Sequence, residues 1–293
     1  MAQIKAEWDD ADSWWDDYVQ SQESGLIELR ELLKELNQMW ERSGNQFDKD
    51  PLVVDWTETS PQAGPLRTNQ EENWSQWFAH LIRDSSGGYT AELFDSRFDR
   101  SPTHVRCERA FHDDELHDRR VDILAEFADQ GMTVEVKTGD EHYEKTPQTA
   151  YLTEKHHQRE LDWTHYLLLQ QDKQTALQSV FNGQISNPEN NRPVISASGP
   201  EECDIIVVYW SDVAQALRRT LLAGVESSTH WRASAYLFTT LIEEQILQFY
   251  ALPSLENYQA TSLGISDIER LQSIAPEDQI THLATVLEET THG

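Results

Sequence analysis

Alternating hydrophobic and polar positions predict a strand-rich middle for this chain. Apolar side chains either recur at every second position, as in a strand with one buried face, or run together, as in a strand buried on both faces. The predicted strands are residues 105–111, 120–127, 132–137, 166–170 and 204–210. Asp129-Gln130-Gly131 predicts a tight turn, so 120–127 and 132–137 should pair as a hairpin.

Helical periodicity surrounds these strands. In residues 26–40 and 69–83 apolar side chains return at intervals of three and four, which places them on one face of a helix. Further helices are predicted at about 147–162, 212–223, 228–250, 266–274 and 277–289. The order is helical, then α-β-β-β-α-β-β-α, then helical again, which is typical of an α/β core with N- and C-terminal helical extensions.

This order divides the chain into three segments. Residues 1–60 hold a helical segment and a Pro-containing linker, 61–223 hold the predicted sheet, and 224–293 form a C-terminal helical region. Within the core, residues 182–203 are polar and rich in Pro and Asn, which predicts a loop. A length of 293 residues fits about two domains.

The charge of the chain is strongly acidic. Asp and Glu total 52 against 23 Lys and Arg, which gives a formal net charge of −29. The acids are spread from end to end, and such a surface repels itself unless salt screens it. The composition resembles that of proteins from halophilic archaea that accumulate salt. Because net charge says little about local patches, it does not exclude nucleic acid as a partner.

Composition also indicates the cellular compartment of the protein and excludes some classes of protein. Hydrophobic residues make up 38 % of the chain, which excludes wholesale disorder. Cys107 and Cys203 are too few for a disulfide framework and fit a reducing compartment. The longest apolar runs fall far short of the ~20 residues that span a bilayer, and no GxxxxGK[ST] motif occurs. We therefore expect a cytoplasmic protein that uses neither a membrane nor ATP.

Three ionisable residues stand where the strand pattern favours apolar ones. Asp122 lies near the start of one predicted strand, and Glu135 and Lys137 interrupt the next. Residues two apart on a strand share a face, so Glu135 and Lys137 point the same way, and hairpin pairing brings Asp122 beside them. Half-buried charges of this kind are costly without a cation or a substrate. Two carboxylates and a backbone carbonyl are oxygen ligands that Mg²⁺ accepts.

This pattern resembles the PD-(D/E)XK nuclease superfamily. Asp122 in "RVD", then 12 residues, then Glu135-Val136-Lys137, lies within a helix–strand–hairpin–strand–helix order over about 68–223. "HYLLLQQ" and "DIIVVYWSDVAQAL" are similar to the later strands of bacterial and archaeal members. The resemblance implies a restriction-endonuclease-like fold, with a mixed β-sheet flanked by helices.

The resemblance also implies roles for these positions. Asp122, Glu135 and the carbonyl of Val136 would bind Mg²⁺, for which Mn²⁺ can substitute, and Lys137 would orient or activate the attacking water. Many members add a glutamate from the first core helix. Glu72 in "TNQEENW" is the better sequence match, whereas Glu71 lies on the inward face with Trp74 and Phe78, so both remain candidates.

Contacts to the substrate are predicted nearby. Arg119 and Arg120 belong to the densest basic stretch of the chain, and they suit either DNA phosphates or salt bridges to the abundant acids. Members of the exonuclease branch carry a Gln and a Tyr on the helix after the ExK strand. Gln148 and Tyr151 lie at similar positions, spaced three apart.

The resemblance implies a Mg²⁺-dependent nuclease that hydrolyses DNA, with a role in restriction, antiviral defence or repair. The alternatives are a catalytically inactive nuclease-fold protein that binds nucleic acid or a protein partner, and a nuclease that acts on RNA or within a complex. The terminal helices are the expected surfaces for a homodimer or a partner protein.

Overall fold

The computed structural model describes residues 70–112, 119–139, 142–157, 161–186, 192–197 and 203–249, with seven single positions outside them (34, 38, 279, 281, 282, 285 and 286). The helices predicted at 26–40, 266–274 and 277–289 lie outside the continuously described ranges. The chain divides into two compact units, one of residues 62–248 and one of 1–61 with 249–293. Every element below belongs to the first unit.

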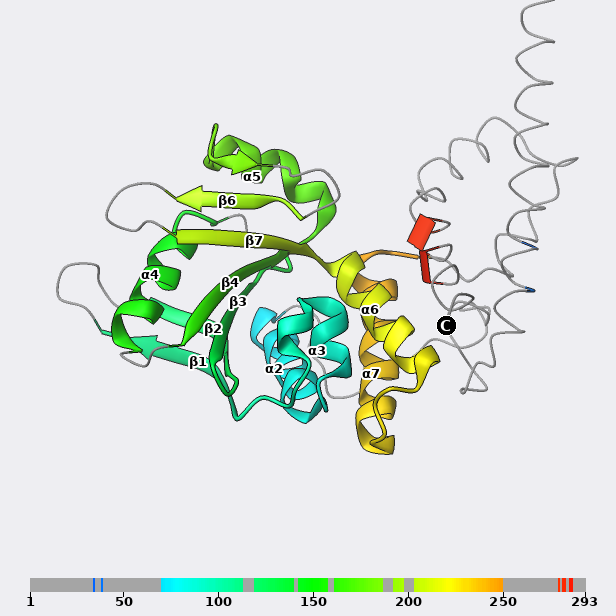
Figure 1. Ribbon diagram of the computed structural model, residues 1–293. Coiled ribbons are helices and arrows are strands. Elements are labelled where there is room, and N and C mark those ends of the chain that lie inside the picture. Colours follow the sequence, from blue (N-terminus) through cyan, green and yellow to red (C-terminus); the bar gives the residue numbers. More distant parts are fainter. Residues whose placement is uncertain are drawn as a thin grey trace, which may run out of the picture. The chain divides into compact units, whose positions relative to one another are not determined.

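A seven-stranded mixed sheet forms the centre of this unit (Figure 1). Its strands are β1 (His104–Phe111), β2 (Arg119–Glu126), β3 (Gln130–Val136), β4 (Asp162–Leu169), β5 (Ile185–Ser186), β6 (Val194–Ala197) and β7 (Cys203–Tyr209). They lie in the order β1-β2-β3-β4-β7-β6-β5, with β3-β4 and β4-β7 parallel and every other pair antiparallel. The predicted α/β class, mixed sheet and β2-β3 hairpin are confirmed.

Helices cover the two faces of the sheet. One layer consists of α2 (Glu71–Asp84), α3 (Gly88–Leu93), α6 (Trp210–Ala223) and α7 (Thr229–Leu241). The opposite face carries α4 (Thr146–His156) and α5 (Gln174–Val180) (Figure 1). Short turns of helix complete the unit: η1 (Ser96–Phe98) and η2 (Gln171–Lys173) are 3₁₀ turns, and η3 (Ile242–Ile246) is a wider π turn after α7.

Aromatic packing joins the first helical layer. The ring of Trp74 lies 5.5 Å from that of Trp210 and 5.7 Å from that of Phe238, between their centroids. The buried indoles also keep hydrogen bonds: Trp231 Nε1 donates to Leu81 O at 2.9 Å. Because α7 packs against α2 in this way, the boundary expected at residue 223 falls inside the unit.

The structure differs from the predicted elements in several places. The short helices α3 and α5 were not predicted, and the helix predicted at 228–250 ends at Leu241, where the π turn η3 follows. The helix expected to reach 162 ends at His156, and β4 begins at Asp162, four residues before the predicted strand. The loop predicted at 182–203 contains β5 and β6, which pair with each other and continue the sheet from β7. These strands are short and polar, so they lack the alternation that reveals a longer strand.

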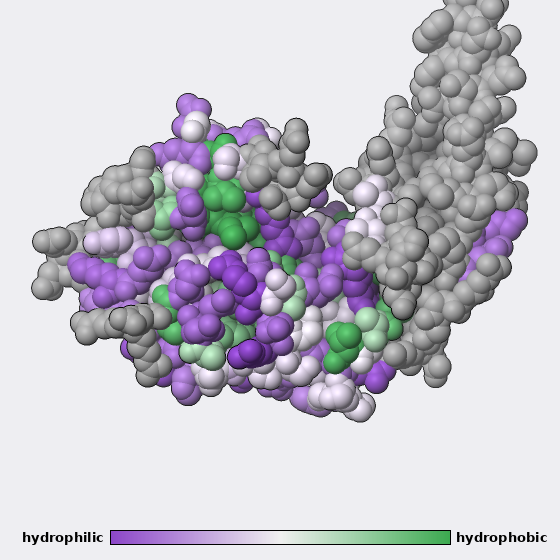
Figure 2. Space-filling view, in the orientation of Figure 1, coloured by the Kyte–Doolittle hydropathy of each residue, from purple (hydrophilic) through white to green (hydrophobic). Residues whose placement is uncertain are grey.

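The outer surface agrees with the acidic composition. Hydrophilic residues cover most of the described part of the face in Figure 2, and hydrophobic areas are small. Among the described residues the large exposed hydrophobic side chains are Val180, Val225 and Leu237. No helix within the described ranges has both the length and the apolar character needed to cross a membrane.

Candidate metal centre

Asp122 lies at a fork between β2 and β3. The two strands pair from Glu126–Gly131 as far as Ile123–Val134, and the pairing stops there. Beyond this pair, a side-chain hydrogen bond takes the place of backbone pairing. Oδ2 of Asp122 accepts a hydrogen bond from the Val136 N–H at 2.8 Å. The fork therefore holds one carboxylate oxygen directly against the segment that carries the other motif residues.

Glu135 and Lys137 meet beside this fork. The Nζ atom of Lys137 lies 3.1 Å from Oε1 of Glu135, and their side chains are only 10 % and 16 % exposed, respectively. The backbone of Lys137 is fixed on both sides, since its N–H donates to Leu168 O at 2.8 Å and its carbonyl accepts from Trp210 Nε1 at 2.9 Å. The two side chains thus share a side, as the alternation predicts.

The helix acid that reaches this region is Glu71. Its Oε1 accepts a hydrogen bond from the Thr138 N–H at 2.7 Å, which ties the first turn of α2 to the end of β3. Glu72 is exposed, and its Oε1 lies 3.9 Å from a guanidinium nitrogen of Arg120. Of the two candidates that the sequence left open, the structure places Glu71 next to the ExK segment.

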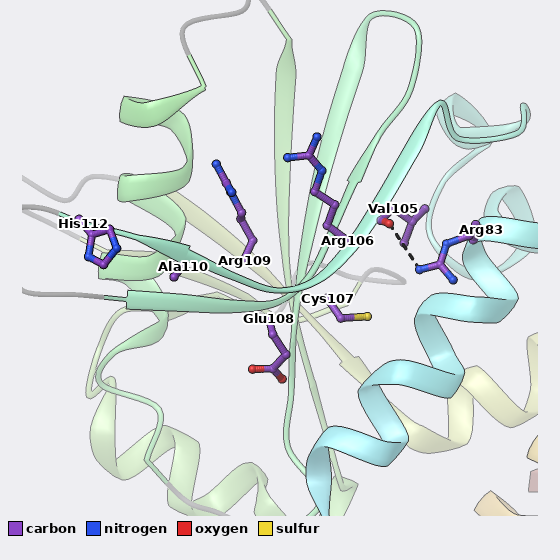
Figure 3. A pocket seen from close by; sticks show the side chains of 8 residues that line it. All are labelled: Arg83, Val105, Arg106, Cys107, Glu108, Arg109, Ala110 and His112. Carbon is purple, nitrogen blue, oxygen red and sulfur yellow. Dashed lines mark hydrogen bonds between the residues drawn. The ribbon is translucent and has the colours of Figure 1, made fainter.

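Glu108 on β1 is a further acid that the sequence did not indicate. Strands β1 and β2 keep one register on both sides of it, but Glu108 has a positive φ of 56°. A regular strand would put Arg106 and Glu108 on one side, whereas Figure 3 shows Glu108 pointing away from Arg106 and Arg109. Positive φ is uncommon outside glycine and is found at functional sites. It turns Glu108 toward Asp122, whose pKa its charge helps to raise.

Burial controls the ionisation of the two central carboxyl groups. It raises the pKa of Asp122 to about 6, although the Val136 N–H and the Lys137 ammonium act in the opposite direction. Burial and then the charge of Asp122 raise the pKa of Glu135 to about 7. Burial alone would lower the pKa of Lys137, but Glu135 and Glu71 outweigh it and the net shift is upward. Without a cation, the two carboxyl groups therefore keep protons to a higher pH than ordinary Asp and Glu side chains, while Lys137 stays charged.

The residues present fit a hard divalent cation. Oε2 of Glu135 is buried and has no hydrogen-bond partner among the described residues. A buried carboxylate oxygen without a partner is costly, and a cation removes that cost. Asp122 and Glu135 supply oxygen ligands, as Mg²⁺ and Mn²⁺ require. A cation here could polarise a bound phosphodiester, with Lys137 beside it.

The predicted substrate contacts have partners within the protein. Arg119 Nε donates to Gln148 Oε1 at 3.1 Å, so these two candidates bind each other. Arg120 forms an ion pair with Glu108. Tyr151, three residues after Gln148, faces the ammonium of Lys155 at 6.0 Å. Arg120 therefore lies next to the acidic residues of the site, through its ion pair with Glu108. Arg119 contacts Gln148 on helix α4 instead.

A basic groove of about 720 Å³ runs along the free edge of β1 (Figure 3). Its lining residues are Arg83, Val105, Arg106, Cys107, Glu108, Arg109, Ala110 and His112. Arg83 donates to Val105 O at 3.4 Å. Within the described ranges neither Arg106 nor Arg109 forms an ion pair, and the guanidinium of Arg109 lies 6.0 Å from the centroid of the Phe111 ring. Glu108 lines this groove, but its side chain points to the other side of β1 from Arg106 and Arg109.

No protein-family model matches the chain, and neither a curated protein nor a solved structure gives a significant match. The functional assignment therefore depends on these residues and their geometry.

The raised carboxyl pKa values predict an unusual stability profile for the metal-free protein. The unfolded chain titrates near pH 4, so between about pH 4 and 7 the folded state binds more protons and loses stability as pH rises. Asp122→Asn should raise the free energy of unfolding at pH 8 in EDTA by about 2 kcal/mol. The Asn amide carries no charge that would be buried at pH 8, and its oxygen can still accept the hydrogen bond from the Val136 N–H.

Urea unfolding at pH 5 and pH 8, with EDTA present, measures this effect. Asp129→Asn is the matched control, because Asp129 is an exposed turn residue. Two results would contradict the predicted burial of charge. In one, Asp122→Asn is no more stable than wild type at pH 8. In the other, the substitution raises the free energy of unfolding by as much at pH 5 as at pH 8.

Proposed function

We propose that the chain is a Mg²⁺-dependent nuclease that hydrolyses phosphodiester bonds in DNA. The observation that carries this function is the meeting of Asp122, Glu135 and Lys137 at the β2–β3 fork. Apart from the short elements α3 and η1, the order is α2-β1-β2-β3-α4-β4, with two antiparallel strand pairs followed by a parallel one. This order supports the restriction-endonuclease-like fold of the PD-(D/E)XK superfamily.

In this mechanism Asp122, Glu135 and the carbonyl of Val136 hold the ion. When bound, Mg²⁺ supplies Lewis-acid polarisation of the phosphoryl oxygen and a water of lowered pKa. Lys137 keeps its proton, because the surrounding carboxylates favour the ammonium. Its N–H groups orient the attacking water and neutralise charge that develops on the phosphate. Glu71 holds the Thr138 N–H and so keeps the ExK segment in place.

The basic groove supports nucleic acid as the substrate. A chain with a net charge of −29 repels a polyanion at long range, so binding requires a local excess of cations. Arg106 and Arg109 provide it on the side of β1 opposite Glu108. Phosphate contacts of this kind position a nucleic acid without reading its sequence. The groove would therefore hold a nucleic acid along the edge of β1 whatever its sequence.

Removing both groove arginines should weaken DNA binding. We expect the Arg106→Gln/Arg109→Gln protein to bind a short duplex at least ten-fold more weakly in EDTA, because two phosphate contacts are lost. The slope of log K against log salt should fall by about 2. Fluorescence anisotropy across a KCl series measures both quantities.

Arg100→Gln is the matched control for this double variant, since Arg100 is 80 % exposed and pairs with Asp99. Equal affinities of the double variant and the control would mean that the DNA takes another path.

The test of the proposed activity is cleavage by the purified full chain. Supercoiled and linear DNA, and an RNA of the same sequence, are incubated with Mg²⁺, with Mn²⁺ and with EDTA, in low and molar KCl. Cleavage of DNA that needs the metal supports the proposed function. Cleavage of RNA alone would make the protein a ribonuclease. DNA binding without cleavage under any metal would favour a catalytically inactive nuclease fold.

A further inference from the structure

A second group of metal-ligating side chains lies where α2 packs against α7. His80 and Asp84 are one turn apart on α2, with His80 Nδ1 3.5 Å from Asp84 Oδ2. His230 comes from the first turn of α7, and its ring centroid lies 5.6 Å from that of His80 at an interplanar angle of 68°. One ligand atom from each of the three residues falls within 4.8 Å of the others.

The backbone on both sides of this group is fixed by packing. Trp231 is buried, follows His230 directly, and donates from Nε1 to Leu81 O, next to His80, at 2.9 Å. Its own N–H is capped by the Ser228 hydroxyl at 3.2 Å. The three ligand side chains, by contrast, are partly exposed, with His80 at 31 % and Asp84 at 38 %, so an ion can reach them from solvent. The fixed backbone keeps the three ligand positions close together before an ion binds.

We propose that His80, Asp84 and His230 bind one divalent transition-metal ion, with Zn²⁺ as the best fit. Two imidazoles and a carboxylate are a common zinc ligand set, with water at the remaining position. Bond lengths of about 2.0–2.2 Å require the three ligand atoms to close in slightly from their present spread. Imidazole disfavours Mg²⁺ and Ca²⁺, which prefer oxygen.

The ligand chemistry separates this site from the centre at the β2–β3 fork. Asp122 and Glu135 offer oxygen alone, whereas the α2–α7 site offers two nitrogens. The protein would therefore hold two chemically different cations, and Zn²⁺ at the second site would join α7 to the helix that carries Glu71. Binding to the folded state alone makes the ion a stabilising clamp.

The test uses full-length protein stripped with EDTA, exchanged into buffer with excess Mg²⁺, and titrated with Zn²⁺ by calorimetry. We expect one equivalent of Zn²⁺ to bind and Tm to rise, and Co²⁺ to give visible absorption bands of a nitrogen-containing site. His230→Ala and Asp84→Asn should each weaken Zn²⁺ binding at least ten-fold and remove the rise in Tm. Asp122→Asn should keep the Zn²⁺ equivalent, which separates this site from the proposed nuclease centre.

His104→Ala is the control for the loss of an exposed histidine. If wild type binds no stoichiometric Zn²⁺, or if His230→Ala and Asp84→Asn both bind it as tightly as the control, the proposal is wrong. In the first case the His80–Asp84 contact is an ordinary pair one turn apart on a helix. In the second case the ion binds elsewhere on the chain. Asp84→Asn preserves the size of the side chain. It therefore tests the site even if His230→Ala fails to fold.

Discussion

Lys137→Ala should lower the rate of DNA cleavage by about 10³-fold or more while leaving the affinity for Mn²⁺ within a few-fold of wild type. The ammonium lies 3.1 Å from Glu135 and supplies no metal ligand, so its loss removes transition-state stabilisation without removing the ion. Asp122→Asn and Glu135→Gln should lose cleavage to a similar extent, but through lost metal affinity. Single-turnover cleavage and Mn²⁺ calorimetry on the same preparations separate the two causes.

The control for this series is Lys145→Ala, which removes an exposed lysine that precedes α4. Its cleavage rate should stay within two-fold of wild type. Full activity in all three site variants would mean that the chemistry lies elsewhere. Loss of Mn²⁺ binding in Lys137→Ala would mean that this residue maintains the geometry of the site and does not act on the substrate.

Glu226→Ala should lower the free energy of unfolding by about 3–4 kcal/mol, because it leaves several buried donors without a partner. The carboxylate is 2 % exposed and accepts from Ser85 Oγ at 2.6 Å, from Ser86 N and Oγ at 2.9 and 2.8 Å, and from Tyr89 N at 3.1 Å. It ties the α6–α7 connection to the start of α3. Urea unfolding of the variant and wild type in the same KCl buffer measures the loss.

Glu92→Ala provides the comparison for Glu226→Ala. Glu92 pairs with Arg219 at 2.6 Å but lies at the surface, where such pairs contribute about 1 kcal/mol or less. A Glu226→Ala protein that loses no more stability than Glu92→Ala would show that water satisfies the freed donors.

Strand alternation is sufficient to locate much of the site. It places Glu135 and Lys137 on one side of β3, and the tight turn before β3 brings Asp122 next to them, as the structure shows. The order α2, β1, β2, β3, α4, β4 follows from the same patterns, because these elements are long enough to show their period. The six-residue helix α3 is too short to do so and was not predicted. The short strands β5 and β6 give no such signal and were predicted as a loop.

Other parts of the site depend on conformation and long-range packing. Glu108 reaches Asp122 only through a positive φ, which a sequence pattern does not predict for glutamate. Helical periodicity put both Glu71 and Glu72 near the start of α2, and the hydrogen bond from Thr138 selects Glu71. Trp210 holds the Lys137 carbonyl from 73 residues away in the chain. Such contacts follow from the packing of helices on the sheet and from no local pattern.

The most direct test of the central claim is to locate the ion. A crystal of the full chain soaked in Mn²⁺, measured by anomalous diffraction near the manganese absorption edge, shows where the metal binds. We predict an anomalous peak between the carboxylates of Asp122 and Glu135 and the carbonyl of Val136, absent from crystals of Asp122→Asn. A protein that cuts DNA with Mn²⁺ in solution but gives no peak at this fork, or gives one elsewhere, would contradict the account.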